Sequence, residues 1–357
     1  MITKQQSLMD LTVPPGITKV EKIVHNYQIF QVLLVAVSLG LFDYLAKEGA
    51  SDRKVIAENI GINGAFSRFF LDGMVENGLL NRDGESYSNN DITNTFLVST
   101  SPLYQGNWIK ENGHGDWSNL EEVLKRQQPQ GINGNSGNIE ALLKSQEETL
   151  LRGELQAVTK TIAGWSGFKN ARTLLDLDGG HGLYTIALCQ ANHELKGIIF
   201  DEPEVIKVTK KYIDKYDLSG QISTAEGNIE TDSFGAGFDI IIVSHLLYRF
   251  RRDIVSFFNR VYKALNPGGL MVVNHWFCAP GCSAEDSSVK ELSKSLQAYG
   301  HPLCHVENFC KNFENAGFDL IVKSEVPSAL GTSLLQLATK GETRKVSSCG
   351  SSGGCCG

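Results

Sequence analysis

From residue 172 onward, the chain alternates short apolar runs with amphipathic helical patterns. Strands are predicted at the apolar runs 174–177, 196–200, 222–225, 239–243, 270–273, 318–323 and 334–338. Helices are predicted among them, at 183–191, 205–216, 253–265 and 306–316. Because apolar strands joined by helices form parallel sheets that are covered on both faces, we expect an α/β domain with a parallel, Rossmann-like, doubly wound sheet of seven strands.

The N-terminal part of the chain follows helical periodicity instead. Helices are predicted at 24–39, 53–59 and 65–77, with Asp52 as the cap of the second, and a small β-hairpin is predicted at 79–87. This order of three helices and a hairpin is typical of a winged-helix domain. In the third helix we expect an inward face made of Phe69, Phe70, Met74 and Val75.

The charge of this module disfavours DNA binding. The helix at 65–77, which would be the recognition helix, carries only Arg68 as a base, beside Asp72 and Glu76. A helix that faces phosphates needs more positive charge, and the whole chain has a net charge of −7. We therefore expect a module for association with a second copy, and no nucleic-acid partner.

Four segments follow from these patterns. They are an N-terminal arm at 1–20, a winged-helix-like dimerisation domain at 21–105, an α/β domain with leading helices at 106–345 and a Gly/Ser-rich tail at 346–357. A long helical pattern from Ile139 to Ile162 precedes the first strand of the α/β domain. The tail carries Cys349, Cys355 and Cys356, which can deliver a soft ion to a site or shuttle redox equivalents; a plain flexible tail is the alternative.

Composition adds an expected compartment. The chain is 41% hydrophobic and 20% charged, as in an ordinary globular protein. The apolar run 29–42 is too short to span a bilayer and contains Gln31 and Ser38, and no signal-peptide pattern is present, so we expect no membrane partner. The 8 scattered cysteines do not resemble a disulfide framework, and the expected location is the reducing cytoplasm.

The segment LLDLDGGHGLY, residues 174–184, carries the first candidate chemistry. It reads as a strand, a turn at Gly179, Gly180 and Gly182, and a helix start, which is how a nucleotide-binding unit begins. It lacks the G-x-G-x-x-G pattern of dinucleotide sites, and no Walker-type phosphate loop occurs in the chain. Asp201 ends the next strand, where a carboxylate can accept both ribose hydroxyls, and Asp176 fits an ammonium group.

These features favour S-adenosylmethionine (SAM) over NAD or ATP as the cofactor. The alternative is a glycine turn that only packs a helix on the sheet. Ligands of such sheets bind at the carboxyl ends of the strands. We expect one crevice there, bordered by Asp176, Asp201, Asn228, Ser244, His245 and Cys278.

Several segments together resemble the SAM-dependent O-methyltransferases of the hydroxyindole and plant phenolic type. The segments are LDLDGGHG, IIFDEPEVI, GNIETDSF, FDIIIVSHLL, NPGGLMVV and NFCKNFENAGF, with VAVSLGLFDYLAKEGA and FLDGMVENGLL in the N-terminal half. The resemblance covers most of residues 20–340. It implies a class I methyltransferase domain, a small-molecule substrate, SAM as cofactor and a homodimer formed through the winged-helix module.

The resemblance also implies roles for individual residues. Asp201 would hold the ribose, Asn228 and Ile229 the adenine, and Ser244 would lie near the methionine carboxylate. Asp178 stands where the family has Gly, and Asn228 where it has Asp. The methionine end of the cofactor would be cradled by Asp176, Gly179, Gly180 and Gly182.

The catalytic positions depart from the family pattern. The family has a His-Asp-Trp segment after the fourth strand, with the histidine as its base, whereas this chain has Tyr248-Arg249-Phe250. Leu303 occupies the place of the acid that orients the base. A tyrosine with a pKa of about 10 is a poor base at neutral pH. We therefore favour an acceptor that is soft or self-activated, namely a thiol, selenol, metalloid, enolisable carbon or amine.

Two alternatives stay open. In one, the protein methylates a conventional small molecule with a relocated base, for which His245, His275, His301 and His305 are candidates, or with a metal held by two of them. In the other, it is a non-catalytic, SAM-binding dimeric regulator. The candidates for catalysis are Tyr248, His245, Cys304 and His305.

Cysteine and tryptophan residues are candidates for substrate contacts. Trp108, Cys278 and Cys304 are the residues expected to touch the substrate, although buried packing is the common use of both residue types. The C-x3-C spacing of Cys278 and Cys282 has no matching second half, so no metal site is predicted.

Overall fold

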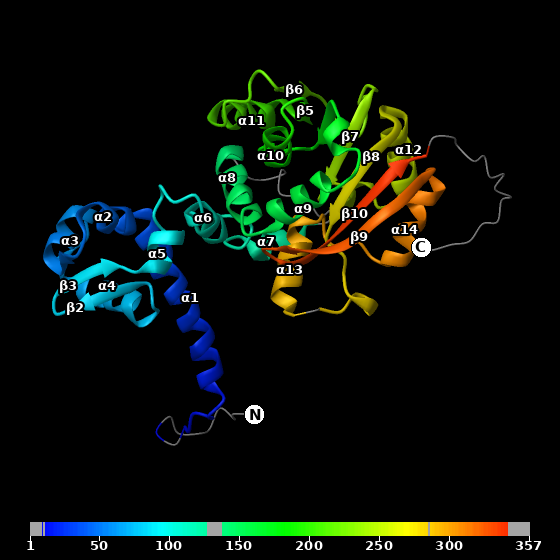
Figure 1. Ribbon diagram of the computed structural model, residues 1–357. Helices are drawn as coiled ribbons and strands as arrows, with labels where there is room; N and C mark the ends of the chain where they lie inside the picture. The colour runs from blue at the N-terminus through cyan, green and yellow to red at the C-terminus, as the bar shows by residue number, and fades with distance from the viewer. Residues whose placement is uncertain (1–8, 10, 127–137, 285, 342–357) are drawn as a thin grey trace. The chain divides into compact units, whose positions relative to one another are not determined.

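A computed structural model describes residues 9, 11–126, 138–284 and 286–341 (Figure 1). The chain forms two compact units, Met1–Ser118 and Asn119–Gly357. The sequence places the division after residue 105 instead. The difference arises because α6, Gly106–His114, packs on α1, Ile17–Ser38, within the first unit. Residues 1–8 and 10 of the predicted arm at 1–20 lie outside the described residues, and its last residues belong to α1, which begins at Ile17. The cysteines of the tail lie outside the described residues entirely.

The N-terminal unit has the predicted order of helices and hairpin. After α1 come α2 (Leu41–Glu48), β1 (Ser51–Asp52), α3 (Arg53–Ile60), α4 (Gly64–Glu76), β2 (Leu80–Asp83), β3 (Ser86–Asn89), α5 (Asp91–Phe96) and α6. The strands form an antiparallel sheet in the order β1-β3-β2. The Asp52 side chain accepts the Lys54 N–H at 2.8 Å, which makes it the expected cap of α3.

One face of α4 differs from the prediction. Met74 is buried, but Phe69 is 81% exposed, so its predicted inward orientation is wrong. Phe66, one turn earlier, is 71% exposed as well. Leu71 takes the inward place instead, which rotates the buried face of the helix relative to the predicted one. Arg68, the base of the presumed recognition helix, is paired with Glu85 of the hairpin at 2.7 Å.

The second unit is an α/β domain whose sheet has the strand order β6-β5-β4-β7-β8-β10-β9. Its strands are β4 (Thr173–Leu177), β5 (Lys196–Asp201), β6 (Ile222–Glu226), β7 (Phe238–Ser244), β8 (Leu265–His275), β9 (Phe318–Ser328) and β10 (Gly331–Lys340). The strands from β4 to β8 pair in parallel, whereas β10 is antiparallel to both β8 and β9. The sheet is therefore mixed, and the expected parallel arrangement is wrong at one edge, where β9 and β10 form an antiparallel hairpin.

Helices cover both faces of this sheet. They are α7 (Leu120–Lys125), α8 (Ile139–Leu150), α9 (Glu154–Ala163), α10 (Leu183–Ala191), α11 (Pro203–Lys215), α12 (Ile254–Ala264), α13 (Ser288–Gln297) and α14 (Val306–Asn315), with 3-10 turns η3 (Phe168–Asn170), η4 (Leu247–Phe250) and η5 (Pro280–Cys282). One core packs α8 to α11 against one face, and the other packs α12 and α14 against the opposite face (Figure 1). Alternate residues of β7 enter the two cores, Ile240 and Ile242 on one side and Ile241 and Val243 on the other.

The helical pattern at 139–162 is interrupted. Gly153 has φ = 128°, a conformation that a side chain disfavours, and it separates α8 from α9. The break places Glu154 in the first turn of α9, where its side chain turns into the domain and is buried.

No single helix among the described residues is long and apolar enough to cross a membrane. The bent pair α1 and α2 passes that test together, by length and composition only.

Candidate functional site

The turn after β4 is shaped for close approach of the backbone. Gly180 and Gly182 have φ values of 57° and 75°, in the left-handed region, and Gly182 precedes the first residue of α10. A Cβ on Gly182 would lie 2.4 Å from Ile199 Cδ1, and one on Gly179 would lie 2.8 Å from Ile199 Cγ2. Glycine is therefore required where the turn packs on β5.

Asp176 lies beneath this turn. Its carboxylate is buried and accepts a hydrogen bond from the Thr185 hydroxyl at 2.8 Å. Burial raises the pKa of Asp176 to about 7, while the Thr185 hydroxyl acts in the opposite direction. Its nearest partner is thus the first turn of α10, and the predicted contact with the methionine ammonium group stays a prediction.

Asp201 ends β5 and meets the glycine turn, as the sequence requires for a ribose site. One carboxylate oxygen accepts the Gly180 N–H at 2.9 Å and the other accepts the Glu202 N–H at 2.7 Å. Each oxygen keeps a lone pair, which suits two neighbouring hydroxyl groups. Burial, followed by the charge of Asp178, raises the pKa of Asp201 to about 8.

A cavity of about 380 Å³ adjoins Asp201 at the adenosine end of the predicted site. It is lined by Glu202, Pro203, Glu204, Gly227 and Asn228. The Asn228 side-chain oxygen accepts the Glu230 N–H at 2.8 Å, so part of that amide is used within its own loop. Ile229 is buried in the apolar core. Their predicted contacts with the adenine stay predictions.

Two residues that depart from the family pattern lie side by side. Arg249 Nη1 is 3.6 Å from Asp178 Oδ1, and Arg249 Nε donates to the Tyr299 hydroxyl at 2.5 Å. Burial raises the pKa of Asp178, and the Arg249 guanidinium opposes that rise. The pair places a cation at the same edge of the sheet as the carboxylates of Asp178 and Asp201.

A hydrogen-bond network joins the end of β7 to α9. His245 Nε2 lies 3.0 Å from Glu154 Oε1, and His245 Nδ1 lies 2.9 Å from the Tyr248 hydroxyl. The same Glu154 oxygen accepts from the Tyr184 hydroxyl at 3.0 Å and from Asn274 Nδ2 at 2.7 Å. Glu154 has 6% of its side chain exposed and His245 has 25%, so the imidazole is the accessible member of the pair.

The donors in this network fix the positions of the protons. The Trp276 N–H donates to the Tyr248 hydroxyl at 2.8 Å, and a backbone amide can only donate. The Tyr248 proton is therefore free to point to His245 Nδ1, which leaves the His245 Nε2–H to donate to Glu154. A histidine whose Nε2–H points to a carboxylate is held in one tautomer and gains support for its protonated form.

The backbone of His245 is also unusual. Its φ of 52° is in the left-handed region, and its N–H donates to the Asn274 carbonyl at 2.8 Å. Such conformations cost free energy and persist where the surroundings enforce them, often at functional sites. Ser244, the preceding residue, ends β7 and is half-buried, and its predicted contact with the methionine carboxylate stays a prediction.

Two other candidates for the base, Tyr248 and His275, are buried and form hydrogen bonds with other groups of the protein. Tyr248 is buried, and burial raises its pKa well above the ordinary value. Both partners of its hydroxyl are protein groups, so it is not placed to take a proton from a substrate directly. His275 is buried too, accepts the Leu247 N–H at 2.8 Å through Nε2 and has a pKa held well below its ordinary value by burial. It stabilises the segment that follows β7.

The cysteine candidates lie together in one cluster, whereas His305 and Trp108 do not belong to it. Cys278 and Cys304 lie together with Cys282 and His301 at one cluster. His305 is exposed at the start of α14 and is absent from the network around His245 among the described contacts. Trp108 lies in α6 and packs against the core of the N-terminal unit, and its predicted contact with a substrate stays untested.

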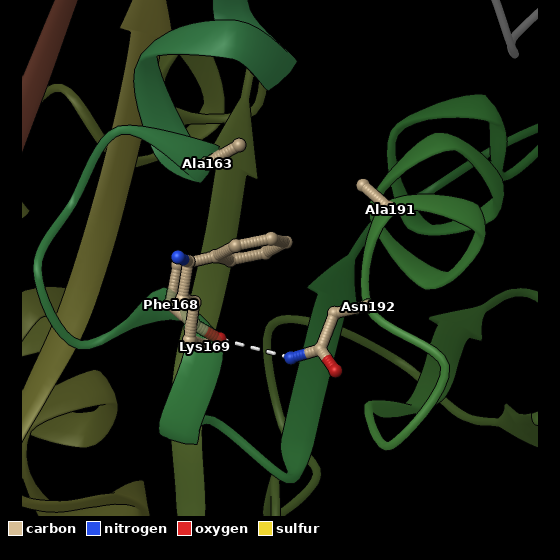
Figure 2. Close-up of a pocket in the computed structure, with 5 residues that line it drawn as sticks. All are labelled: Ala163, Phe168, Lys169, Ala191 and Asn192. Carbon is tan, nitrogen blue, oxygen red and sulfur yellow. Dashed lines mark hydrogen bonds between the residues drawn. The ribbon is translucent and has the colours of Figure 1, made fainter.

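A second cavity, of about 310 Å³, lies away from these groups. Ala163, Phe168, Lys169, Ala191 and Asn192 line it, and Figure 2 shows Asn192 turned toward the backbone of Phe168, whose carbonyl accepts its Nδ2–H at 2.9 Å. These residues precede β4 and β5, so this cavity is at the amino edge of the parallel strands. It has no acid or histidine in its lining.

Glu154 is the functional candidate that the sequence does not reveal. It lies in an ordinary amphipathic pattern 91 residues before His245, with no motif around it. The single local signal is Gly153, which breaks the helical pattern and places an acid in the first turn that follows.

Comparison with known proteins gives a consistent result along the chain. Residues 117–319 match the O-methyltransferase domain family, and residues 21–99 match the O-methyltransferase dimerisation domain family. The chain is 29% identical over 337 residues to an uncharacterised protein of Methanocaldococcus jannaschii, covering 87% of this chain and 86% of that protein. It is 25% identical over 324 residues to an N,N-dimethyltransferase of Streptomyces rimosus, covering 87% and 92%.

Among solved structures, human N-acetylserotonin methyltransferase in complex with SAM has a similar fold. The TM-score is 0.74 at 19% identity, and the match covers 92% of this chain and 99% of that one.

Proposed function

The chain belongs to the O-methyltransferase family whose members carry a dimerisation domain, and we propose that it methylates a small-molecule hydroxyl or amine with His245 as the proton acceptor. SAM dependence is the common property of this family, and the glycine turn and Asp201 fit that cofactor. When bound, SAM supplies an electrophilic methyl group on a sulfonium. The acceptor must lose a proton to become neutral after it accepts that group.

The pair of His245 and Glu154 is the observation that carries this proposal. The imidazole lies at the carboxyl end of β7, the edge where ligands of such sheets bind, and Glu154 holds its Nε2 at 3.0 Å. Glu154 replaces the orienting acid that is missing at Leu303, and His245 replaces the base that is missing at Tyr248. A positioned base is worth roughly 10²–10⁴-fold in rate. The relocated-base alternative is therefore better supported than the expectation of a self-activated acceptor.

The proposal includes hydroxyl and amine acceptors together, because a neutral group of either kind must lose a proton when it is methylated. The family is named for oxygen, and the Streptomyces rimosus relative is named for nitrogen. Hydroxyl and amine groups each lose one proton in the reaction, which His245 can take through Nδ1, the ring nitrogen without a hydrogen, once the Tyr248 hydroxyl turns away from it. Both classes are thus compatible with the pair.

A soft acceptor is the second candidate, and the cluster of thiols favours it. Cys278, Cys282 and Cys304 lie beyond Trp276, whose ring is 4.2 Å from that of His245 between centroids. Three thiols can hold a metalloid, which needs no base to accept a methyl group. Such an acceptor would make His245 dispensable.

The proposed assembly is a homodimer formed through the N-terminal unit. Large apolar side chains are exposed on its helices, which is costly in a monomer but typical of an interface. They include Val20, Ile23, Val24 and Tyr27 on α1 and Phe66 and Phe69 on α4.

An acceptor screen tests the proposal. The full chain is incubated with SAM and with phenols, aromatic amines, thiols and arsenite, and formation of S-adenosylhomocysteine is measured. We expect turnover on a hydroxyl or amine, and a loss of roughly 10²-fold or more in kcat for His245→Asn with SAM affinity retained. Turnover confined to thiols or arsenite, with His245→Asn fully active, would establish the soft acceptor instead. Tight SAM binding without turnover on any acceptor would support a regulator.

A further inference from the structure

Four side chains with metal-binding atoms meet where two loops of the α/β domain come together. Cys278 and Cys282 lie around η5, after β8, while His301 and Cys304 lie between α13 and α14. One ligand atom from each of the four lies within 4.8 Å of those from the other three. We propose that these side chains form a binding site for a thiophilic divalent cation, with Zn²⁺ as its occupant.

The distances within the cluster agree with tetrahedral coordination. Cys278 Sγ and Cys282 Sγ are 3.7 Å apart, too far for a disulfide, and Cys304 Sγ is 3.4 Å from His301 Nδ1. A tetrahedral ion with Zn–S bonds of about 2.3 Å and a Zn–N bond of about 2.0 Å places sulfurs about 3.8 Å apart and a sulfur and nitrogen about 3.5 Å apart. The remaining pairs lie within 4.8 Å, and His301 Nδ1, now 2.7 Å from the Pro302 carbonyl oxygen, must exchange that contact for the ion.

The ligand set selects the type of ion. Three thiolates and one imidazole form one of the usual closed zinc sites, in which four protein ligands leave no open position. No carboxylate belongs to the cluster, so Ca²⁺ and Mg²⁺, which require oxygen ligands, are disfavoured. Cys278, His301 and Cys304 are half-buried and Cys282 is exposed, which gives an ion a path to the site.

The backbone holds the two loops together at this place. Phe277 and Leu303 form a parallel bridge, in which the Cys278 N–H donates to the Leu303 carbonyl at 2.9 Å and the Leu303 N–H donates to the Trp276 carbonyl at 3.0 Å. Cys282 and Tyr299 have φ values of 55° and 51°, unusual for residues with side chains. These strained residues lie in the turns that carry the ligands, as expected where the binding of an ion offsets the cost of the strained backbone.

A cation here would clamp the segment that supports His245. The Trp276 carbonyl is tied to the Leu303 loop, and its N–H donates to the Tyr248 hydroxyl, which contacts His245. The site is thus linked to the proposed base through Trp276 and Tyr248, while none of its ligands belongs to the network of Glu154 and His245. Its role is structural, so cation binding and methyl transfer can be tested separately.

The sequence predicts no metal site, because the C-x3-C pair of Cys278 and Cys282 has no matching second half at zinc-finger spacing. In the fold this pair lies beside His301 and Cys304, which have the spacing H-x2-C and follow 19 residues after Cys282. The segment that contains α13 separates the two pairs along the chain.

Metal analysis of the full chain tests the site. Protein purified without chelators from zinc-supplemented medium should contain about one Zn²⁺ per chain, measured by inductively coupled plasma mass spectrometry. Replacement by Co²⁺ should give the intense visible absorption of a tetrahedral cobalt thiolate. Calorimetry with SAM on the same samples reports separately on the cofactor site. If the protein without zinc has the same thermal stability as the protein that contains zinc, the proposal is overturned.

Matched variants locate the ion. Cys278→Ser, Cys304→Ser and His301→Ala should each lose most of the zinc, whereas Cys310→Ser, which removes a thiol on α14 outside the cluster, should keep it. A triple variant with serine at Cys349, Cys355 and Cys356 should also keep it. If the triple variant loses the zinc and Cys278→Ser and Cys304→Ser retain it, the ion belongs to the tail and the proposal fails. Methylation of arsenite that requires Cys278 and Cys304 would likewise assign these thiols to a substrate instead.

Discussion

Arg249 Nη1 lies 3.6 Å from Asp178 Oδ1, so two residues that differ from the family pattern form one ion pair. The family has an acid after its catalytic histidine and a glycine in the turn after the first strand of the sheet, whereas this chain has Arg249 and Asp178. The carboxylate of Asp178 raises the pKa of neighbouring Asp201, and the guanidinium offsets part of the buried charge. The two substitutions therefore compensate one another beside the proposed ribose site.

The ion pair should be visible in SAM affinity. Arg249→Ala leaves the Asp178 carboxylate unpaired next to Asp201, and we expect it to weaken SAM binding roughly tenfold, as for loss of one charge-assisted contact. Adding Asp178→Gly, which the φ of 58° accommodates, should restore most of that affinity. Calorimetric titration of the wild type, both single variants and the double variant measures the coupling. Additive effects would show that the pair does not act as a unit.

Asp201→Asn should separate stability from binding. An acid whose folded-state pKa is raised contributes stability below its unfolded pKa of about 3.9, and that contribution is lost as the pH rises toward the folded value. For Asp201 the folded value is about 8, so the wild type without SAM should lose thermal stability between about pH 4 and 8. Asp201→Asn should lose less, yet bind SAM roughly tenfold more weakly.

The comparison is made by thermal unfolding at several pH values with and without SAM. Glu194→Gln, which alters an exposed acid just before β5, at the opposite end of that strand from Asp201, is the matched control and should follow the wild type. Unchanged SAM affinity in Asp201→Asn would remove Asp201 from the cofactor site.

The fold was largely predictable because its signals are local. Apolar runs and glycine turns predicted every strand of the large sheet, and α10 begins and ends at the predicted residues 183 and 191. The antiparallel pairing of β10 was not predicted, since an apolar run carries no direction. Phe69 was assigned to the wrong face because apolar residues lie on more than one side of this helix. The sequence does not distinguish the side that packs in the unit from a side that a second chain can cover.

The candidate site was predictable only where it follows strand ends. Asp176 lies near the end of an apolar run, and Asp201 and His245 lie where the next runs end, which brings them to one edge of the sheet. Glu154 and His301 reach their partners through loops and helix packing, and neither has a motif that reports such contacts. Their roles depend on distances of 3.0 Å to His245 and 3.4 Å to Cys304, which a sequence does not contain.

The homodimer should depend on the exposed face of α4. Phe66→Ser combined with Phe69→Ser removes two apolar side chains that are 71% and 81% exposed, so the fold of the unit should be unaffected. We expect sedimentation velocity at micromolar concentration to show the wild type as a dimer and this variant shifted toward monomer. Val289→Ser, at a 63% exposed position on α13, is the control and should remain dimeric. A monomeric wild type would contradict the proposed assembly.

Tyr248→Phe should be milder than loss of His245. The substitution keeps the ring but removes the hydroxyl that lies 2.9 Å from His245 Nδ1 and accepts the Trp276 N–H. The imidazole keeps Glu154, so we expect a decrease in kcat of roughly tenfold or less, against roughly 10²-fold or more for His245→Asn. Steady-state kinetics on one acceptor compares them. A collapse in Tyr248→Phe equal to that in His245→Asn would make the phenol part of the proton path.

Glu154→Gln tests whether the buried acid supports the base. Glutamine has the same shape and its oxygen can still accept from Tyr184, Asn274 and His245, so the network should persist. What is lost is the negative charge that stabilises the imidazolium formed on proton transfer. We expect kcat to fall roughly 10–100-fold, the value of a hydrogen bond to a charged group, with little change in SAM affinity. An unaltered rate would leave Glu154 as a packing residue and remove the principal support for His245 as the base.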